Sequence, residues 1–219
     1  MADALQLLIA LVTGLAAGFL VSMPIGPINI TIINEGAQRG FLRAWMVGLG
    51  AVTMDVIYCS VGLAGFSGLF EGKKVRALME LMSFMLVTFL GFKYLLMRSV
   101  KTTSHTAQVI EEHLHPHTAY MTGLVRVLGN PAALLLWVTL SATFVAHEWV
   151  DPFLLSKVLC VVGVAIGATS WFTLISYAVS RSHKQFSDKT LLRLSQGSGA
   201  LLLGAAVFIA GRLVLMLAR

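Results

Sequence analysis

Charge is scarce in this sequence, and the shortage decides the class of protein. Charged residues make up 12% of the chain and hydrophobic residues 57%, and the mean hydropathy is +0.84. A soluble globular domain carries about 25% charged residues. The apolar residues also gather in blocks that are longer than a buried core helix needs. These features argue against a soluble fold and predict an integral membrane protein.

Cysteine is also rare, and the patterns of catalytic sites are missing. Cys59 and Cys160 lie in apolar segments without a Cys-x-x-Cys partner, which argues against a disulfide framework or a metal cluster. The sequence has no paired carboxylates, nucleophile arrangement or intramembrane metal motif. We therefore predict no enzyme activity, no bound metal and no cofactor. The net charge of +6 comes from loops and helix ends, where it sets orientation in a membrane rather than binding nucleic acid.

Six apolar segments follow one another, and each holds the roughly 20 apolar residues that a spanning helix requires. They cover residues 5–34, 44–69, 77–97, 118–146, 152–180 and 194–218. The pattern predicts an all-α membrane protein with six transmembrane helices in a single domain, residues 1–219. A polar, His-rich loop at residues 99–117 separates two halves of three helices, 1–98 and 118–219. An odd number of helices per half makes the second half enter from the opposite side, as in an inverted repeat.

Basic residues in the loops predict the orientation. Eight lie after the first, third and fifth segments, and five lie on the other side. The eight are Arg39, Arg43, Arg98, Lys101, Arg181, Lys184, Lys189 and Arg193. Because cytoplasmic loops carry an excess of Lys and Arg, we expect the odd loops in the cytoplasm and both termini outside.

The first apolar segment is broken by Pro24-Ile25-Gly26-Pro27, and the fourth by Asn130-Pro131. A straight helix over residues 4–34 would reach roughly 46 Å, against a hydrocarbon core of about 30 Å. Inside lipid, freed backbone groups are tolerated only where protein buries them or a cavity receives them. Paired breaks in the two halves point to the binding site of a transporter. The alternative is that these prolines only kink packed helices.

Several polar residues near the breaks have the chemistry of such a site. A half-helix that starts at Pro27 has free amides, next to Asn29, that favour an anion such as a carboxylate. Asn130 is expected to cap the helix that Pro131 opens. Asp55 lies near the middle of the second segment, so it should face the bundle interior. It fits a proton carrier, a counter-charge for a cationic substrate or a structural acceptor, and Trp171 fits an aromatic wall or plain packing.

A second chemistry is present in the loop at residues 99–117. This loop contains His105, Glu111, Glu112, His113, His115 and His117. Neutral imidazole is a good ligand for zinc and similar ions. Short His-rich tracts are also found as solvated loops, so both interpretations stay open.

The run Ser22-Met23-Pro24-Ile25-Gly26-Pro27-Ile28-Asn29 resembles the Gly-Pro signature of the lysine-exporter (LysE/RhtB) translocators. Asp55 is similar to the acidic residue in the second helix of the lysine-exporter branch. Gly129-Asn130-Pro131-Ala132 resembles the Asn-Pro motif that opens the fourth helix, and Trp171-Phe172 resembles an aromatic pair of the fifth helix.

The resemblance implies a multi-pass secondary exporter of amino acids or related small metabolites in the bacterial cytoplasmic (inner) membrane. Its partners would be the small-molecule substrate, protons that drive the export, and the lipid bilayer, and pairing into a homodimer is left open. The residues expected to bind substrate or couple transport are Pro24, Gly26, Pro27, Asn29, Asp55, Asn130, Pro131 and Trp171. Related families move metal ions, so the alternative is a zinc- or cadmium-type exporter that uses the His-rich loop.

Overall fold

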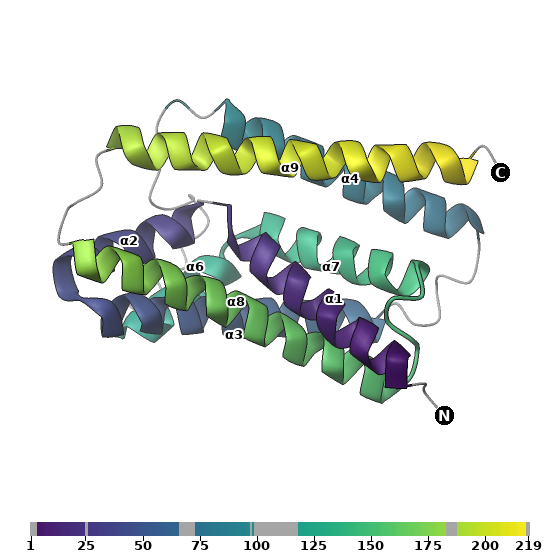
Figure 1. Ribbon diagram of the computed structural model, residues 1–219, viewed down its shortest axis with the longest axis horizontal. Helices are drawn as coiled ribbons and strands as arrows, with labels where there is room; N and C mark the ends of the chain where they lie inside the picture. The colour runs from purple at the N-terminus through teal and green to yellow at the C-terminus, as the bar shows by residue number, and fades with distance from the viewer. Residues whose placement is uncertain are drawn as a thin grey trace.

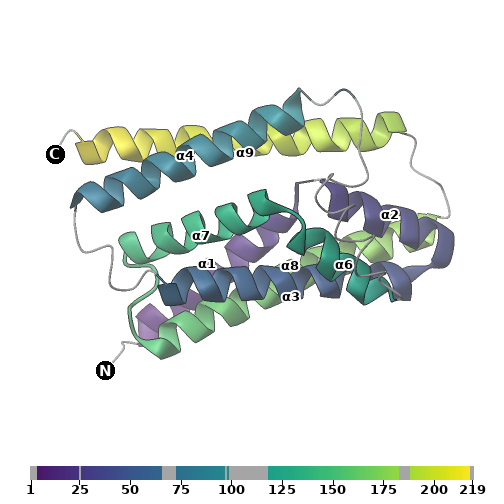
Figure 2. The same cartoon turned by 180° about the vertical axis from the view of Figure 1, so that it is seen from behind.

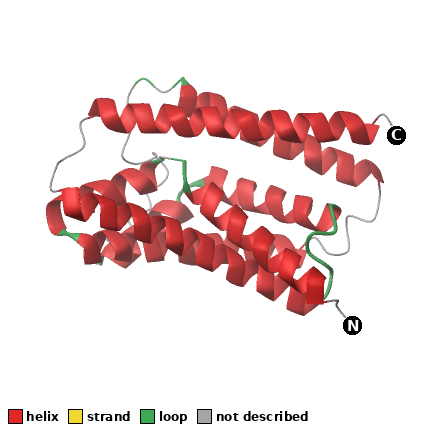
Figure 3. Cartoon of the chain, viewed as in Figure 1, coloured by secondary structure: helices red, strands yellow, loops and turns green. Residues whose placement is uncertain are grey.

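The computed structural model describes residues 4–24, 26–65, 73–96, 98, 118–182 and 188–217, and within these ranges every regular element is an α-helix (Figure 3). The helices are α1 (Ala4–Ser22), α2 (Pro27–Arg39), α3 (Phe41–Gly65), α4 (Lys73–Leu95), α6 (Ala119–Leu128), α7 (Pro131–Ala146), α8 (Leu154–Ser182) and α9 (Asp188–Leu217). The His-rich loop predicted at residues 99–117 lies outside the described residues.

Both predicted breaks interrupt helices. The first segment is divided into α1, which ends at Ser22, and α2, which begins at Pro27. The fourth segment is divided into α6 and α7, whose axes are bent by 71° at the Asn130-Pro131 step. In each case a proline occupies the first position of the new helix, where its missing N–H is not needed.

Three of the described helices are long and apolar enough to cross a membrane, namely α1, α3 and α8. The bent pair of α6 and α7 passes the same test if it is counted as one broken span. An all-α membrane protein with several spans is therefore confirmed. The full count of six spans stays a prediction.

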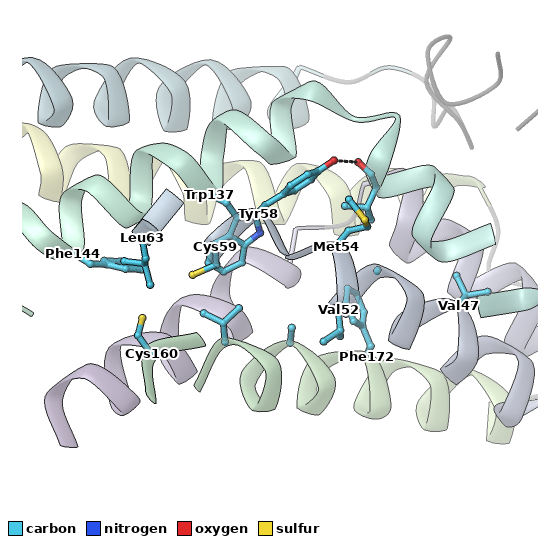
Figure 4. Close-up of a cluster of buried hydrophobic side chains, with 14 of the residues drawn as sticks. Val47, Val52, Met54, Tyr58, Cys59, Leu63, Trp137, Phe144, Cys160 and Phe172 are labelled. Carbon is cyan, nitrogen blue, oxygen red and sulfur yellow. Dashed lines mark hydrogen bonds between the residues drawn. The ribbon is translucent and has the colours of Figure 1, made fainter. Parts of the chain in front are cut away.

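The helices form two groups (Figures 1 and 2). The helices α4 and α9 lie side by side along their lengths, and α4 also contacts α7. The larger group places α1 against α8, α6 and α7 against α3, and α2 between α3 and α8. Its core surrounds the fully buried indole of Trp137 (Figure 4).

Glycines set the closest helix contacts. The Gly14-x3-Gly18 and Gly163-x3-Gly167 motifs face each other across the α1–α8 contact. A Cβ atom at Gly14 would lie 1.9 Å from the carbonyl oxygen of Cys160. A Cβ atom at Gly123 would likewise lie 1.9 Å from the carbonyl oxygen of Val47, where α6 meets α3. These helices can approach so closely because only glycine leaves room for the neighbouring backbone in these places.

The position of the first break follows from the way α1 and α2 pack on α8. Gly18 of α1 packs on Val164, and Gly36 of α2 packs on Val179, so α1 and then α2 follow α8 in the same direction. The break between them therefore lies beside the middle of α8, which runs from residue 154 to residue 182. Trp171 occupies this middle stretch.

Candidate functional site

Asn29 holds the first break together. Its side chain is fully buried, and Nδ2 donates to the carbonyl oxygens of Ser22 at 2.8 Å and Pro24 at 2.7 Å. Its Oδ1 accepts a hydrogen bond of 3.2 Å from the indole nitrogen of Trp171. The Pro24 carbonyl also accepts a 2.9 Å bond from the backbone amide of Gly26, so it is the Ser22 carbonyl for which the amide of Asn29 replaces a backbone partner.

The same contacts place Trp171 at the break. Its ring meets the ring of Phe19 edge-on, with 5.5 Å between centroids and 86° between planes. The structure thus brings Asn29 and Trp171 together beside Pro24. In this conformation the indole nitrogen of Trp171 bonds to Asn29, and the Asn29 amide bonds to the main chain. Both side chains therefore stabilise the shape of the break.

The start of α2 carries no side-chain cap. Gly26 is its N-cap residue and Pro27 its first residue, and the first main-chain bond runs from the amide of Ile30 to the carbonyl of Gly26 at 3.1 Å. A Cβ atom on Gly26 would lie 2.8 Å from the hydroxyl oxygen of Tyr94. Tyr94 of α4 therefore closes the break from the second group of helices.

At the second break, the expected capping role of Asn130 is wrong. Asn130 occupies the N-cap position of α7, but its side chain makes no capping hydrogen bond. The reason is local: the amide of Ala133 bonds instead to the backbone carbonyl of Asn130 at 3.0 Å. Since Pro131 has no N–H, this tight turn removes one of the few amides that a side chain could cap.

Two side chains of α3 bond to residues before and after the second break. The Tyr58 hydroxyl donates to the carbonyl oxygens of Val127 and Leu128, both at 3.4 Å, at the end of α6. Figure 4 draws one of these bonds as a dashed line. One turn earlier, Asp55 Oδ1 accepts a 2.7 Å hydrogen bond from the indole nitrogen of Trp137, after the break in α7. The Asp55 side chain is buried, so the expectation that it faces the interior is confirmed.

Arg126 connects the two breaks. It lies in the last turn of α6, and its Nη1 donates to the hydroxyl oxygen of Thr31 in α2. The Thr31 hydroxyl in turn donates to the carbonyl oxygen of Pro27 at 2.8 Å. A charged side chain just before the second break therefore reaches the helix that begins after the first break, so the two interruptions are linked through the interior.

Asn29 and Asp55 are both buried in this conformation. An open groove lies on the surface of α8, away from Asp55, and is lined by residues such as Thr169, Ser170 and Tyr177. No group of three or more His, Cys, Asp or Glu residues in the described ranges could hold a metal ion.

With this geometry established, comparison with known proteins gives the family. The family model described as LysE type translocator matches residues 19–212, a range that contains both breaks, Asp55 and Arg126. The chain belongs to this family. It is also similar to the protein named "Putative amino acid efflux protein YcgF" of Bacillus subtilis (strain 168), with 26% identity over 189 residues. The match covers 85% of this chain and 88% of that protein. No solved structure matches significantly.

Membership of the LysE-type translocators makes the chain a transporter rather than an enzyme. Three residues of its site were not predicted from the sequence: Tyr58, Tyr94 and Arg126. Tyr58 follows Asp55 by three positions, the spacing that puts both on one helix face. Arg126 lies only four positions before Asn130, too deep in an apolar segment for a simple end-of-helix cation. These two spacings were the available signals, whereas nothing in the sequence distinguishes Tyr94.

Proposed function

We propose that this LysE-type translocator is a secondary exporter of amino acids or related small metabolites, driven by the proton gradient. The observation that carries the proposal is a buried carboxylate, Asp55, beside the second of two helix breaks in one interior. An ionised carboxylate in a membrane domain costs about 2.5–3.5 kcal/mol on insertion scales. Charged residues inside membrane domains are rare, almost always have a partner group, and mark ion and substrate pathways.

Each part of the site has a place in this proposal. The free amides in the first turns of α2 and α7, with their positive dipole ends, attract the carboxylate of the substrate. Asp55 binds the substrate amine or carries the exchanged proton. Asn29 and Trp171 hold the main chain of the first break in its non-helical conformation. Pro24, Gly26 and Pro131 interrupt the helices.

Alternating access follows from two inverted repeats, in which one half of the protein moves against the other. The pairing of helices supports this arrangement, since α1 packs on α8 as α6 packs on α3, and α2 packs on α8 as α7 packs on α3. In each pair, part of the broken first segment of one predicted half packs on the second segment of the other half. We place the protein in the cytoplasmic membrane of a bacterium.

The test is transport by the reconstituted protein. Liposomes with an imposed pH gradient are loaded with radiolabelled basic, neutral or acidic amino acids, and efflux is measured for the wild type, Asp55→Asn and Asp151→Asn. Asp151 is the matched control, because its carboxylate lies before α8 near Gln6, away from both breaks. We expect Asp55→Asn to abolish gradient-driven efflux and Asp151→Asn to retain it. Normal gradient-driven efflux by Asp55→Asn would remove Asp55 from the mechanism.

The same liposomes test the alternative substrate class. Zinc and cadmium are offered in place of amino acids, and residues 105–117 are deleted in a parallel variant. An amino-acid exporter should export neither metal, and its amino-acid efflux should be unchanged by the deletion. Export of metal together with no export of any amino acid would contradict the proposal.

A further inference from the structure

One charged side chain at the breaks has no role in the proposal above. Arg126 is partly buried at the end of α6, four residues before Asn130, and its guanidinium donates to Thr31 of α2. Thr31 is itself buried and tied to the carbonyl of Pro27. The chain of bonds from Arg126 through Thr31 to Pro27 thus joins the end of one half-helix to the start of another.

The position of Arg126 suits a binding group better than a structural cation. An arginine inside a membrane domain costs about 2.5–3.5 kcal/mol on insertion scales, and such residues face the protein interior and mark substrate and ion pathways. A Thr–main-chain bond would hold the first turn of α2 without it. What a guanidinium adds is a planar set of five N–H donors, which matches the two oxygens of a carboxylate.

A second observation at the first break also points to a polar ligand. The hydroxyl oxygen of Ser22, at the end of α1, is buried with 6% of the residue exposed, and it has no hydrogen-bond partner among the described residues. Buried hydroxyl groups are normally paired. Ser22 is also the residue whose carbonyl accepts from Asn29, so this unpaired hydroxyl lies at the break itself. Near it, α2 begins at Gly26 and Pro27 without a side-chain cap.

We propose that Arg126 binds the carboxylate of the exported substrate, and that the carboxylate takes the place of the Thr31 hydroxyl on the guanidinium. This inference rests on the proposed exporter function and names its substrate class. The substrates are compounds with a free carboxylate, such as zwitterionic amino acids, and the corresponding amides, amines and metal cations are excluded. Exchange of Thr31 for substrate also releases the link between α6 and α2, so that binding permits the two breaks to move apart.

The test compares an acid with its amide. The twenty common L-amino acids are first tested for efflux in liposomes, and each exported one is then compared with its carboxamide, which lacks the negative charge. For the wild type we expect the KM of the amide to exceed the KM of the acid at least tenfold. In Arg126→Gln this ratio should fall to about one, because the KM of the acid rises and that of the amide does not.

Arg43→Gln is the matched control. Arg43 makes a 3.9 Å ion pair with Glu35 at the end of the bundle, and its side chain is 47% exposed. Its replacement should leave the ratio of the two KM values at the wild-type level. A circular-dichroism melt in detergent checks that each variant is folded. If Arg126→Gln does not fold, Arg126→Lys carries the test, since lysine keeps the charge but loses the planar fork, and the ratio should fall partway.

The outcomes separate this inference from the function on which it rests. If the wild type exports none of the twenty amino acids, the proposed function fails. If the wild type exports an amino acid and the folded Arg126 variants keep the full acid-to-amide ratio, the function stands and the role of Arg126 is overturned. A third variant, Thr31→Val, removes the competing hydroxyl and should lower the KM of the acid. A rise in that KM would overturn the exchange step.

Discussion

At the scale of single residues, Asn29 makes three side-chain hydrogen bonds at the first break, because its amide bonds to two main-chain carbonyls and one indole. We predict that Asn29→Ala destabilises the protein by about 1–3 kcal/mol, the cost of leaving one buried carbonyl, that of Ser22, without its donor. Thermal unfolding in detergent measures the loss. Asn34→Ala is the matched control, because Asn34 is exposed on the same helix. Equal melting temperatures for the two variants would contradict the role of Asn29.

The sequence predicts which polar residues lie inside more readily than what they bind. Asp55 had to face the interior, since a lone carboxylate in an apolar helix has no tolerable place in lipid. The partners of Asn29 could not be predicted, because they depend on which carbonyls the break leaves unpaired. The capping role of Asn130 failed for a related reason: a main-chain turn to Ala133 competes for the same amide.

At the scale of helices, the glycines of α1 and α8 act as spacers for one contact. We predict that Gly14→Ala lowers stability by about 1–3 kcal/mol, the usual cost of overpacking, because its Cβ would overlap the carbonyl of Cys160. The measurement is the melting temperature in detergent. Gly204→Ala is the control, since a Cβ there meets nothing within 4 Å. A melting temperature for Gly14→Ala at or above that of Gly204→Ala would mean that the two helices are not in close contact.

Helices and breaks were predictable because their causes are local. Proline at positions 24, 27 and 131 interrupts a helix wherever the rest of the chain lies. The partners of the helices were not predictable in the same way. A Gly-x3-Gly motif predicts close packing but does not name the neighbour, and the contact of Tyr94 with Gly26 joins residues 68 positions apart.

At the scale of the whole molecule, the packing fixes which segments share an end of the bundle. Gln6, near the start of α1, donates to the carbonyl of Glu148 at 2.5 Å, so the N-terminal end lies with the connection between α7 and α8 (Figures 1 and 2). Gly36 of α2 packs on Val179 at the opposite end. The basic residues Arg39, Arg43 and Arg181 follow these two positions closely in sequence, and so they gather at that second end.

Because the packing separates the two ends of the bundle, the orientation predicted from the basic residues can be tested by labelling. Because Lys and Arg gather on the cytoplasmic side, the end with Arg39 should face the cytoplasm and the Glu148 end should face outward. Single cysteines at Gln38 and Phe153, both exposed, sample the two ends, while native Cys59 and Cys160 are fully buried and should stay silent. In intact cells a membrane-impermeant maleimide should label Phe153→Cys at once and Gln38→Cys only after permeabilisation. The reverse pattern would invert the orientation, and labelling of both positions in intact cells would contradict the packing that sets the two ends apart.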